Sequence, residues 1–220
     1  MNSPIIHSLI VAASATIIGF FIVLPLSYWG AYRKYPGKWL LEIILLMPLV
    51  LPPTIVGLYI LRLFGRYGVL GQLLEQLGLS LIFSLAGAVM ATTIVIIPLL
   101  YQGIKGALTS VPRSLIQVAQ TLSASPREIL FRIILPNCWP SVLASVLLAF
   151  CRGLGEFGAS LMVAGYIEGK TDTIATSIYF AVQQGNDQKA TILSLINIGI
   201  GLCILLVIQL LTYKKREDFS

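Results

Sequence analysis

The sequence predicts an all-α polytopic membrane protein with five transmembrane helices. Hydrophobic residues make up 57% of the 220 positions and charged residues only 11%, whereas soluble proteins carry about 25% charged residues. Several long intervals contain no Asp, Glu, Lys or Arg, and about 20 apolar residues are enough to cross a bilayer as a helix. No interval between them could hold a soluble domain, so residues 1–220 are expected to form one membrane domain.

Five charge-free intervals define the expected spans. They are Ser8–Tyr32, Ile43–Leu61, Gln76–Ile104, Ile133–Cys151 and Ala190–Tyr213, the third being apolar mainly from Leu79 to Tyr101. The first interval lacks the basic leading region and small-residue cleavage pattern of a signal peptide. We therefore expect it to be retained as a span.

The positions of the basic residues predict the orientation. Four of them would lie on one side if the spans alternate, namely Arg62, Arg66, Lys170 and Lys189. Ten would lie on the other side, namely Arg33, Lys34, Lys38, Lys105, Arg113, Arg127, Arg132, Lys214, Lys215 and Arg216. Because basic residues concentrate on the cytoplasmic side of membrane proteins, we expect the N-terminus outside and the C-terminus in the cytoplasm. This distribution, rather than a nucleic-acid surface, accounts for the net charge of +6.

Proline interrupts the second expected span. The run Met47–Pro53 contains Pro48, Pro52 and Pro53, and each proline removes a backbone donor and crowds the preceding turn. The helix is therefore predicted to break or kink here. The freed carbonyls need partners from protein or a water-filled cavity, so the break indicates either a translocation path or a kink that only shapes packing.

The fourth expected span carries two charges. Arg152 and Glu156 would lie near the middle of a helix that continued to Ala164, with Gly155 between them. Their i, i+4 spacing would allow them to pair on one face. Charges inside a membrane usually face a bundle interior or polar pathway, so the pair could be structural, could belong to a path or gate, or both.

A polar, basic loop at about residues 105–135 separates the third and fourth spans. We expect one short helix at Leu115–Leu122, a turn, and a second helix at Arg127–Ile134, with Ser125 as the N-cap and Pro126 in the first helical position. The second helix would present an apolar face made of Ile129, Leu130, Phe131 and Ile133. A short amphipathic helix of this kind can insert into a groove of a partner protein.

Part of this loop resembles the coupling signature of ATP-binding-cassette (ABC) importer permeases, Glu-Ala-Ala…Gly…Ile-x-Leu-Pro. The matching positions are Gln117, Ala119, Ser123, Ile133, Leu135 and Pro136. The resemblance implies that Gln117–Pro136, including Ile129 and Phe131, docks on an ATPase subunit. Gln117 replaces the acidic residue, Val118 the first alanine and Ser123 the glycine. Loss of the acid would weaken one ATPase contact, whereas the serine is tolerable if its backbone avoids positive φ.

Three further runs narrow the resemblance. The sequences Arg152–Ala159, Met47–Pro53 and Phe64–Gly71 together are similar to the molybdate permease family, over nearly the whole chain. The first run alone is shared with sulfate permeases. The resemblance implies a type I ABC importer permease (MetI-like) fold in the bacterial cytoplasmic (inner) membrane, surrounded by lipid. It also implies a homodimer with one path, two cytoplasmic ATPases and an external oxyanion-binding protein.

We expect no enzyme activity, catalytic residue, metal site or cofactor in this chain. It lacks the phosphate-binding run G-x-x-x-x-G-K-[ST], so ATP and Mg would be used by the partner ATPase. Thr54, Thr92 and Thr93 are candidates for transient contacts with the cargo. His7, the single histidine, is expected to be a plain interfacial residue.

Several alternatives remain open. The cargo could be tungstate, which resembles molybdate in size and charge, or sulfate. From another class, the chain could be a stand-alone carrier or channel, which the coupling-like loop argues against. A membrane-embedded hydrolase would need a set of polar catalytic residues that the sequence does not offer.

Overall fold

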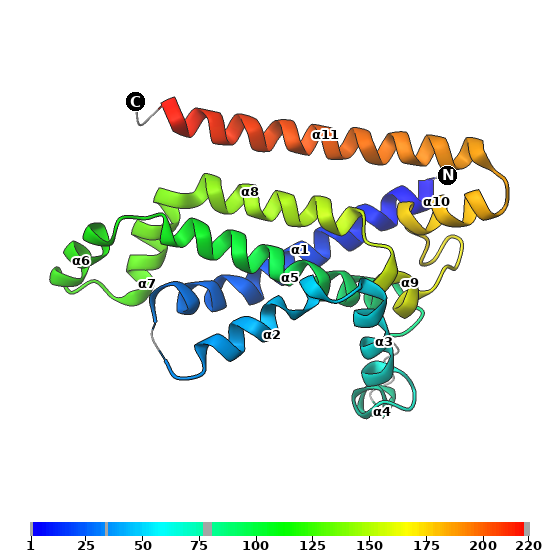
Figure 1. The fold of residues 1–220 in the computed structure, drawn as a ribbon, viewed down its shortest axis with the longest axis horizontal. Helices are drawn as coiled ribbons and strands as arrows, with labels where there is room; N and C mark the ends of the chain where they lie inside the picture. Colours follow the sequence, from blue (N-terminus) through cyan, green and yellow to red (C-terminus); the bar gives the residue numbers. More distant parts are fainter. Residues whose placement is uncertain (1, 34, 77–80, 218–220) are drawn as a thin grey trace.

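The structure is a computed structural model that describes residues 2–33, 35–76 and 81–217, with the backbone alone for residues 212–217. Three long helices lie side by side in its centre: α1 (Asn2–Tyr32), α5 (Leu85–Thr109) and α8 (Leu135–Leu154). Figure 1 shows α11 (Asp187–Glu217) running along one side of this bundle. Lys34 and Leu79 lie outside the described residues, as do the side chains of Lys214, Lys215 and Arg216.

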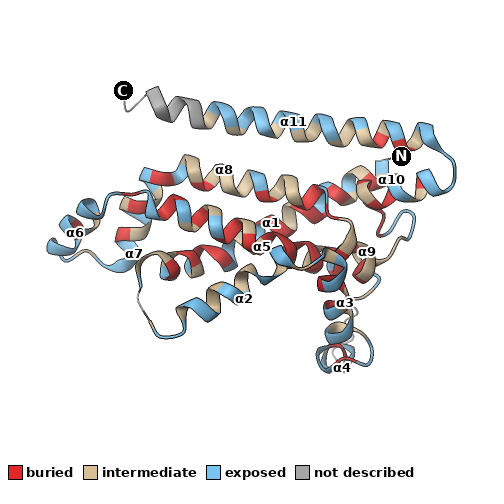
Figure 2. Cartoon of the chain, in the orientation of Figure 1, coloured by how far each residue is buried: buried red, intermediate tan, exposed pale blue. Residues whose placement is uncertain are grey.

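Small residues allow α1 and α5 to pack closely. Ala12 and Ala15 of α1 and Ala88 and Ala91 of α5 are completely buried. Small side chains bring helix axes together, which is the usual way in which helices associate in membranes. Figure 2 shows buried residues concentrated on α1, α5 and α8, whereas α11 is mostly exposed or half-buried. The core of the chain therefore lies between the three central helices.

The predicted break in the second span is confirmed and is sharp. Helix α2 (Lys38–Val50) ends before Pro52, α3 (Pro53–Phe64) begins immediately after it, and the two helices meet at an angle of 113°. Pro52 lacks a backbone donor, and a proline also disfavours a helical conformation in the residue before it. The expected span Ile43–Leu61 is thus divided between two helices. Pro48 lies inside α2, which continues past it.

The third span begins later than predicted. The interval from Gln76 was expected to be part of it, but the short α4 (Val69–Gln76) is a separate helix and α5 starts at Leu85. Ser84 is the N-cap of α5, and its Oγ accepts a hydrogen bond of 3.2 Å from the Gly87 N–H. A serine in this position satisfies a free donor of the first turn, which explains the start of the helix.

The fourth span is longer than the predicted interval Ile133–Cys151 at both ends, and it ends shortly after Arg152. Residues Pro126–Leu154 form one continuous apolar helical stretch, made of α7 (Pro126–Glu128), the π-helical segment η1 (Ile129–Ile134) and α8. The separate second loop helix predicted at Arg127–Ile134 is therefore wrong. The helix ends after α8, and two shorter helices, α9 (Gly158–Ala164) and α10 (Ile174–Gln183), connect it to α11.

Within the described residues, four helical stretches are long and apolar enough to cross a membrane. They are α1, α5, Pro126–Leu154 and Asp187–Leu211, and the bent pair α2–α3 could supply a fifth span.

Candidate functional site

The predicted break between α2 and α3 lies against a second interruption, between α8 and α9. A Cβ added to Gly158, at the start of α9, would lie 3.2 Å from Pro53 Cβ and 3.2 Å from Thr54 Cγ2 at the start of α3. One turn further along, a Cβ on Gly57 would lie 2.9 Å from the Ala159 Cα. The glycines therefore let the backbones of α3 and α9 touch. Two segments about 100 residues apart in the sequence thus form one structural unit, here called the double break.

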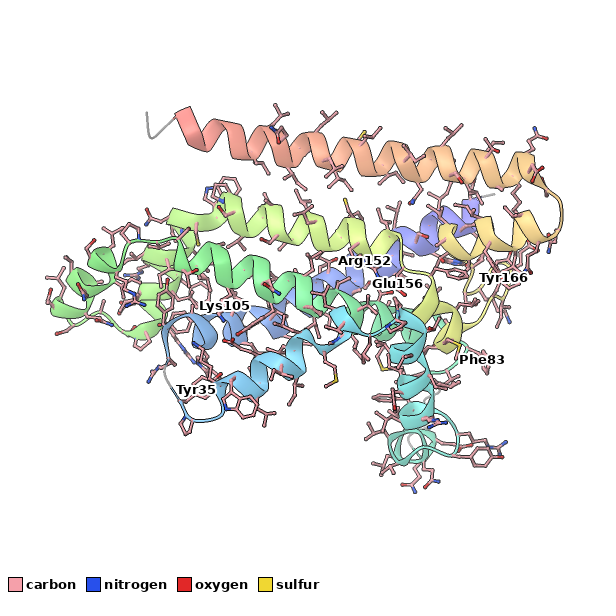
Figure 3. The ribbon with its side chains drawn as sticks, in the orientation of Figure 1. Tyr35, Phe83, Lys105, Arg152, Glu156 and Tyr166 are labelled. Atoms are coloured by element: carbon pink, nitrogen blue, oxygen red, sulfur yellow. The ribbon has the colours of Figure 1, made fainter. Side chains whose placement is uncertain are left out.

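Arg152 and Glu156 form an ion pair at the double break (Figure 3). Arg152 Nη1 lies 2.9 Å from Glu156 Oε2, and the side chains are 39% and 1% exposed respectively. The second Glu156 oxygen, Oε1, accepts a hydrogen bond of 2.9 Å from the Ala159 N–H. The predicted pairing is confirmed, but its geometry differs from the prediction, because α8 ends at Leu154 and Glu156 lies beyond it. Glu156 thereby joins the end of α8 to the first turn of α9.

Gly155 and the three threonines differ in their surroundings. Gly155 forms the C-cap of α8, with open space around it. Thr92 is fully buried beside Gly153, and its hydroxyl has no hydrogen-bond partner within the described part of the chain. The Thr93 hydroxyl donates to the Val89 carbonyl at 2.7 Å, while Thr54 is exposed. Of the three hydroxyls, that of Thr93 is therefore bonded within its own helix, whereas that of Thr92 is buried and unpartnered among the described residues.

The first helix of the loop is close to its prediction. Helix α6 spans Arg113–Thr121. Ala119 is its one buried residue and packs into the main core, whereas Gln117 is exposed. Figure 1 shows α6 and α7 projecting together from one end of the bundle.

The turn that ends α6 places Ser123 in the left-handed region. Its φ is 58°, the Ser123 N–H donates to the Gln120 carbonyl, and the Ala124 N–H donates to the Ala119 carbonyl. This is the Schellman arrangement, in which the residue with positive φ is usually glycine. The condition under which serine would be tolerated here, a backbone that avoids positive φ, is therefore not met, because the turn itself requires that conformation. The signature glycine would fit this position better than serine does.

The next residues confirm the predicted N-cap. Ser125 Oγ accepts from the Glu128 N–H at 3.3 Å, and the Ser125 N–H donates to Glu128 Oε2 at 2.9 Å. This reciprocal capping box fixes the start of the helix, with Pro126 in the first turn as predicted.

The Ile-x-Leu-Pro end of the signature lies within a helix rather than at its end. Pro136 cannot donate a backbone hydrogen bond, and the preceding segment widens into the π-helical η1, in which the Leu135 N–H bonds to the Leu130 carbonyl. Such a widening is a common response to a proline or a missing bond in a helix. Ile133 and Leu135 are half-buried here, and Pro136 is exposed.

The predicted apolar docking face is divided by the structure. Phe131 is 59% exposed, whereas Ile129 is only 3% exposed and packs into the core with Ala119 and Ile134. The inclusion of Ile129 in an exposed face is therefore wrong: its side chain supports the loop from inside. The sequence pattern could not separate the two residues because it assumed an isolated helix.

Two polar clusters could not be foreseen from sequence. Glu42 Oε1 of α2 lies 2.6 Å from Lys105 Nζ of α5 and accepts a hydrogen bond of 3.3 Å from the Tyr101 hydroxyl. At the opposite end, His7 Nδ1 lies 2.9 Å from Asp172 Oδ1, and Asp172 is 1% exposed. His7 is therefore not the plain interfacial residue that we expected. For Glu42, the signal available in the sequence was an acidic residue directly before the start of the expected span Ile43–Leu61.

Comparison with known proteins decides the family. The model of the family described as "Binding-protein-dependent transport system inner membrane component" matches residues 23–216. The chain belongs to this family. It is accordingly an inner-membrane ABC permease subunit, a class of protein that is not itself an ATPase, and members of the family work with ATPase and binding-protein partners.

Several relatives are similar along nearly their whole length. The chain is 34% identical over 223 residues to the molybdenum transport system permease protein ModB of Escherichia coli K12, covering 99% of this chain and 97% of the relative. It is 36% identical over 220 residues to ModB of Haemophilus influenzae, covering 99% and 96%. A putative molybdenum transport permease of Bacillus subtilis, YvgM, is 36% identical over 189 residues, covering 86% and 83%.

Solved structures show the same fold at low identity. The methionine ABC transporter MetNI in an inward-facing conformation matches with a TM-score of 0.74 at 16% identity, covering 96% of this chain and 94% of the other. A bacterial alginate ABC transporter matches with a TM-score of 0.71 at 18% identity, covering 99% and 78%. The predicted MetI-like permease fold is thereby confirmed.

Proposed function

We propose that this chain is the permease subunit of an ATP-driven importer that carries molybdate across the cytoplasmic membrane. The observation that carries the proposal is the identity of 34–36% with molybdenum permeases of two bacteria over 99% of the chain. The chain would act as a homodimer with one path between its two copies. Two cytoplasmic ATPase subunits and an external oxyanion-binding protein would complete the complex.

The orientation in this proposal follows from the basic residues. The loop at residues 105–135 and the C-terminus would face the cytoplasm, and the N-terminus, α4 and α10 would face outside. The loop would then project from the bundle toward the ATPase. Its ordered turn and capping box support this role, because a segment that transmits force has to be stiff.

Exposed residues of the loop would form the docking surface. Gln117, Phe131 and Pro136 are exposed and could contact the ATPase. Ile129 and Ala119 would anchor the loop to the core, so that a movement of the loop moves the bundle with it. ATP and Mg would be used by the partner alone, and this chain would bind no cofactor.

The double break is the proposed position of the path or gate. On one side the chain bends at Pro52 and Pro53, just after the helix that contains Pro48. On the other side α8 ends at Gly155, between Arg152 and its ion-pair partner Glu156. Irregular backbone at membrane depth usually lines a cavity, and an intramembrane ion pair is a functional candidate. ATP binding would close the ATPase dimer, push on the loops and turn the permease outward to accept the oxyanion; hydrolysis would reset it inward.

The cargo is tested by uptake of labelled molybdate into vesicles that hold the complete complex. We expect excess tungstate to suppress the uptake of molybdate and excess sulfate to leave it unchanged. Equal suppression by sulfate would contradict selectivity for molybdate and favour the sulfate alternative, and uptake of tungstate in strong preference to molybdate would reassign the cargo.

A further inference from the structure

A cavity of about 740 Å³ lies between the end of α1 and the loop helices α6 and α7. Three basic residues from three separate segments line it: Arg33 follows α1, Lys38 begins α2 and Arg113 begins α6. Gln117 and Gln120 of α6 complete its polar wall, and no Asp or Glu is among the described residues that line it. Tyrosine and isoleucine side chains, with Ala31 and Pro126, form the rest of the surface.

The positive charge of this cavity is largely uncompensated. Neither Arg33 nor Arg113 has an ion-pair partner in the part of the chain that the structure describes. Lys38 Nζ is 4.0 Å from Glu42 Oε1, but the same oxygen lies 2.6 Å from Lys105 Nζ. One carboxylate is thus shared between two lysines, and the two arginines face the cavity without one. Because Arg33 and Arg113 are exposed, water and salt screen their mutual repulsion, but an anion that enters this space would be attracted by all three cations.

Gln117 affects the net charge of the cavity. It occupies the position at which the coupling signature has an acidic residue, and a carboxylate in the wall would have offset one of the positive charges. The glutamine instead offers an amide that can donate hydrogen bonds. The departure from the signature therefore leaves the cavity with three cations and two amides, whereas an acidic residue would have offset one of the three positive charges.

We propose that this cavity binds a tetrahedral oxyanion group. Arginine forks bind two oxygens of such a group at once, and lysine adds a point charge. The group could belong to the headgroup of an anionic phospholipid, since basic pockets beside membrane helices bind such headgroups, or to a free oxyanion. An occupant would join the end of α1 to α6, so that binding here would stiffen the loop. The site is separate from the translocation path, although Gln117 also belongs to the proposed docking surface, and the binding of an anion there goes beyond the transport role.

The test uses the full-length permease in lipid nanodiscs and requires neither transport nor an ATPase. One arm measures how far phosphatidylglycerol is enriched over bulk phosphatidylcholine among the lipids retained by the protein. The other measures equilibrium binding of labelled phosphate and molybdate in phosphatidylcholine alone. The variants are R33Q/R113Q and Q117E, with R127Q as the matched control, because Arg127 is an exposed arginine of the same loop that does not line the cavity.

For the wild type we expect either enrichment of phosphatidylglycerol or saturable binding of a free oxyanion, and the signal that is seen identifies the source of the bound group. R33Q/R113Q should abolish that signal, and R127Q should leave it unchanged. Q117E should weaken it by about tenfold or more, because a carboxylate would lie within a few ångströms of the bound anion. Absence of both signals in the wild type, or an equal loss in R127Q, would overturn the proposal. Failure of molybdate transport would leave these binding results unaffected.

Discussion

Gly57 of α3 and Ala159 of α9 lie so close that a Cβ at Gly57 would be 2.9 Å from the Ala159 Cα and 2.8 Å from the Met162 Cβ. Real Cβ atoms do not approach backbone atoms this closely, so any larger residue at position 57 must separate the helices. We expect G57A to lower stability by about 1–3 kcal/mol, as overpacking of a tight contact usually does. Thermal unfolding of the purified protein measures this effect.

G106A is the matched control for that variant. Gly106 also lies within a helix, but a Cβ there would meet nothing within 4 Å. Alanine is the better helix former, so G106A should leave stability unchanged or raise it by up to about 1 kcal/mol. Equal losses of stability in G57A and G106A would show that the contact between α3 and α9 is not the cause.

Ser123 is predicted to be a strained residue. Its φ of 58° matches that of Gly185, whose φ is 71° in the same type of turn at the end of α10. A left-handed conformation costs an ordinary residue roughly 1–2 kcal/mol. S123G should therefore stabilise the protein by about 1 kcal/mol, and G185S should destabilise it by a similar amount. A loss of stability in S123G would show that the serine side chain makes a contribution that the backbone argument omits.

The contributions of Arg152 and Glu156 to stability are predicted to be coupled. Loss of one partner of a buried ion pair costs about 3–5 kcal/mol, and the partial exposure of Arg152 should reduce this figure. We expect R152Q to destabilise the protein, because it leaves a buried carboxylate unpaired, and the double variant R152Q/E156Q to be less destabilised than the sum of the single variants. A double-mutant cycle measures the coupling. Strict additivity would contradict the pairing.

Exchanging Arg152 and Glu156 distinguishes a role of the ion pair in stability from a role in transport. Glu156 also accepts a bond from the first turn of α9, a place where a positive charge is unfavourable. R152E/E156R should therefore lose stability even though the pair is formally retained. If the exchanged protein assembles normally but does not transport, the charges serve the path rather than the packing.

Phe131 is predicted to contact the ATPase. Its side chain is 59% exposed on the loop, so F131E should disrupt docking while the permease remains folded. Co-purification of the ATPase with the permease measures docking, and Q188E, which adds the same charge at an exposed position of α11, is the control. An unchanged complex with F131E would contradict the assignment. Ile129 is unsuitable for this test because a charge there would enter the core.

Local chemistry explains which features the sequence could predict. The adjacent Pro52 and Pro53 disfavour a continuous helix, Ser125 with Glu128 favours the start of one, and charge-free intervals mark apolar helices, so these features follow from neighbouring residues. The side of a helix that is covered depends on distant residues. The burial of Ile129 and the pairing of Glu42 with Lys105 therefore became visible only in the folded chain.

The same reasoning applies to the candidate site. The sequence indicated both halves of the double break, because proline and intramembrane charge are local signals. It could not show that Gly158 meets Pro53, since the contact joins segments far apart in the chain. The sequence also left the φ of Ser123 open, because this angle is set by the hydrogen bonds of the turn and not by the residue itself.

The central claim is that this chain moves an oxyanion only when an ATPase acts on its loop. The most direct test compares labelled molybdate uptake by vesicles that contain the permease alone with uptake by vesicles that also contain the ATPase, the binding protein and ATP. We expect molybdate uptake by the complete system, and no uptake when the ATPase is omitted or when the permease carries F131E. Uptake by the permease alone, without ATP, would contradict it and would identify the chain as a stand-alone carrier or channel.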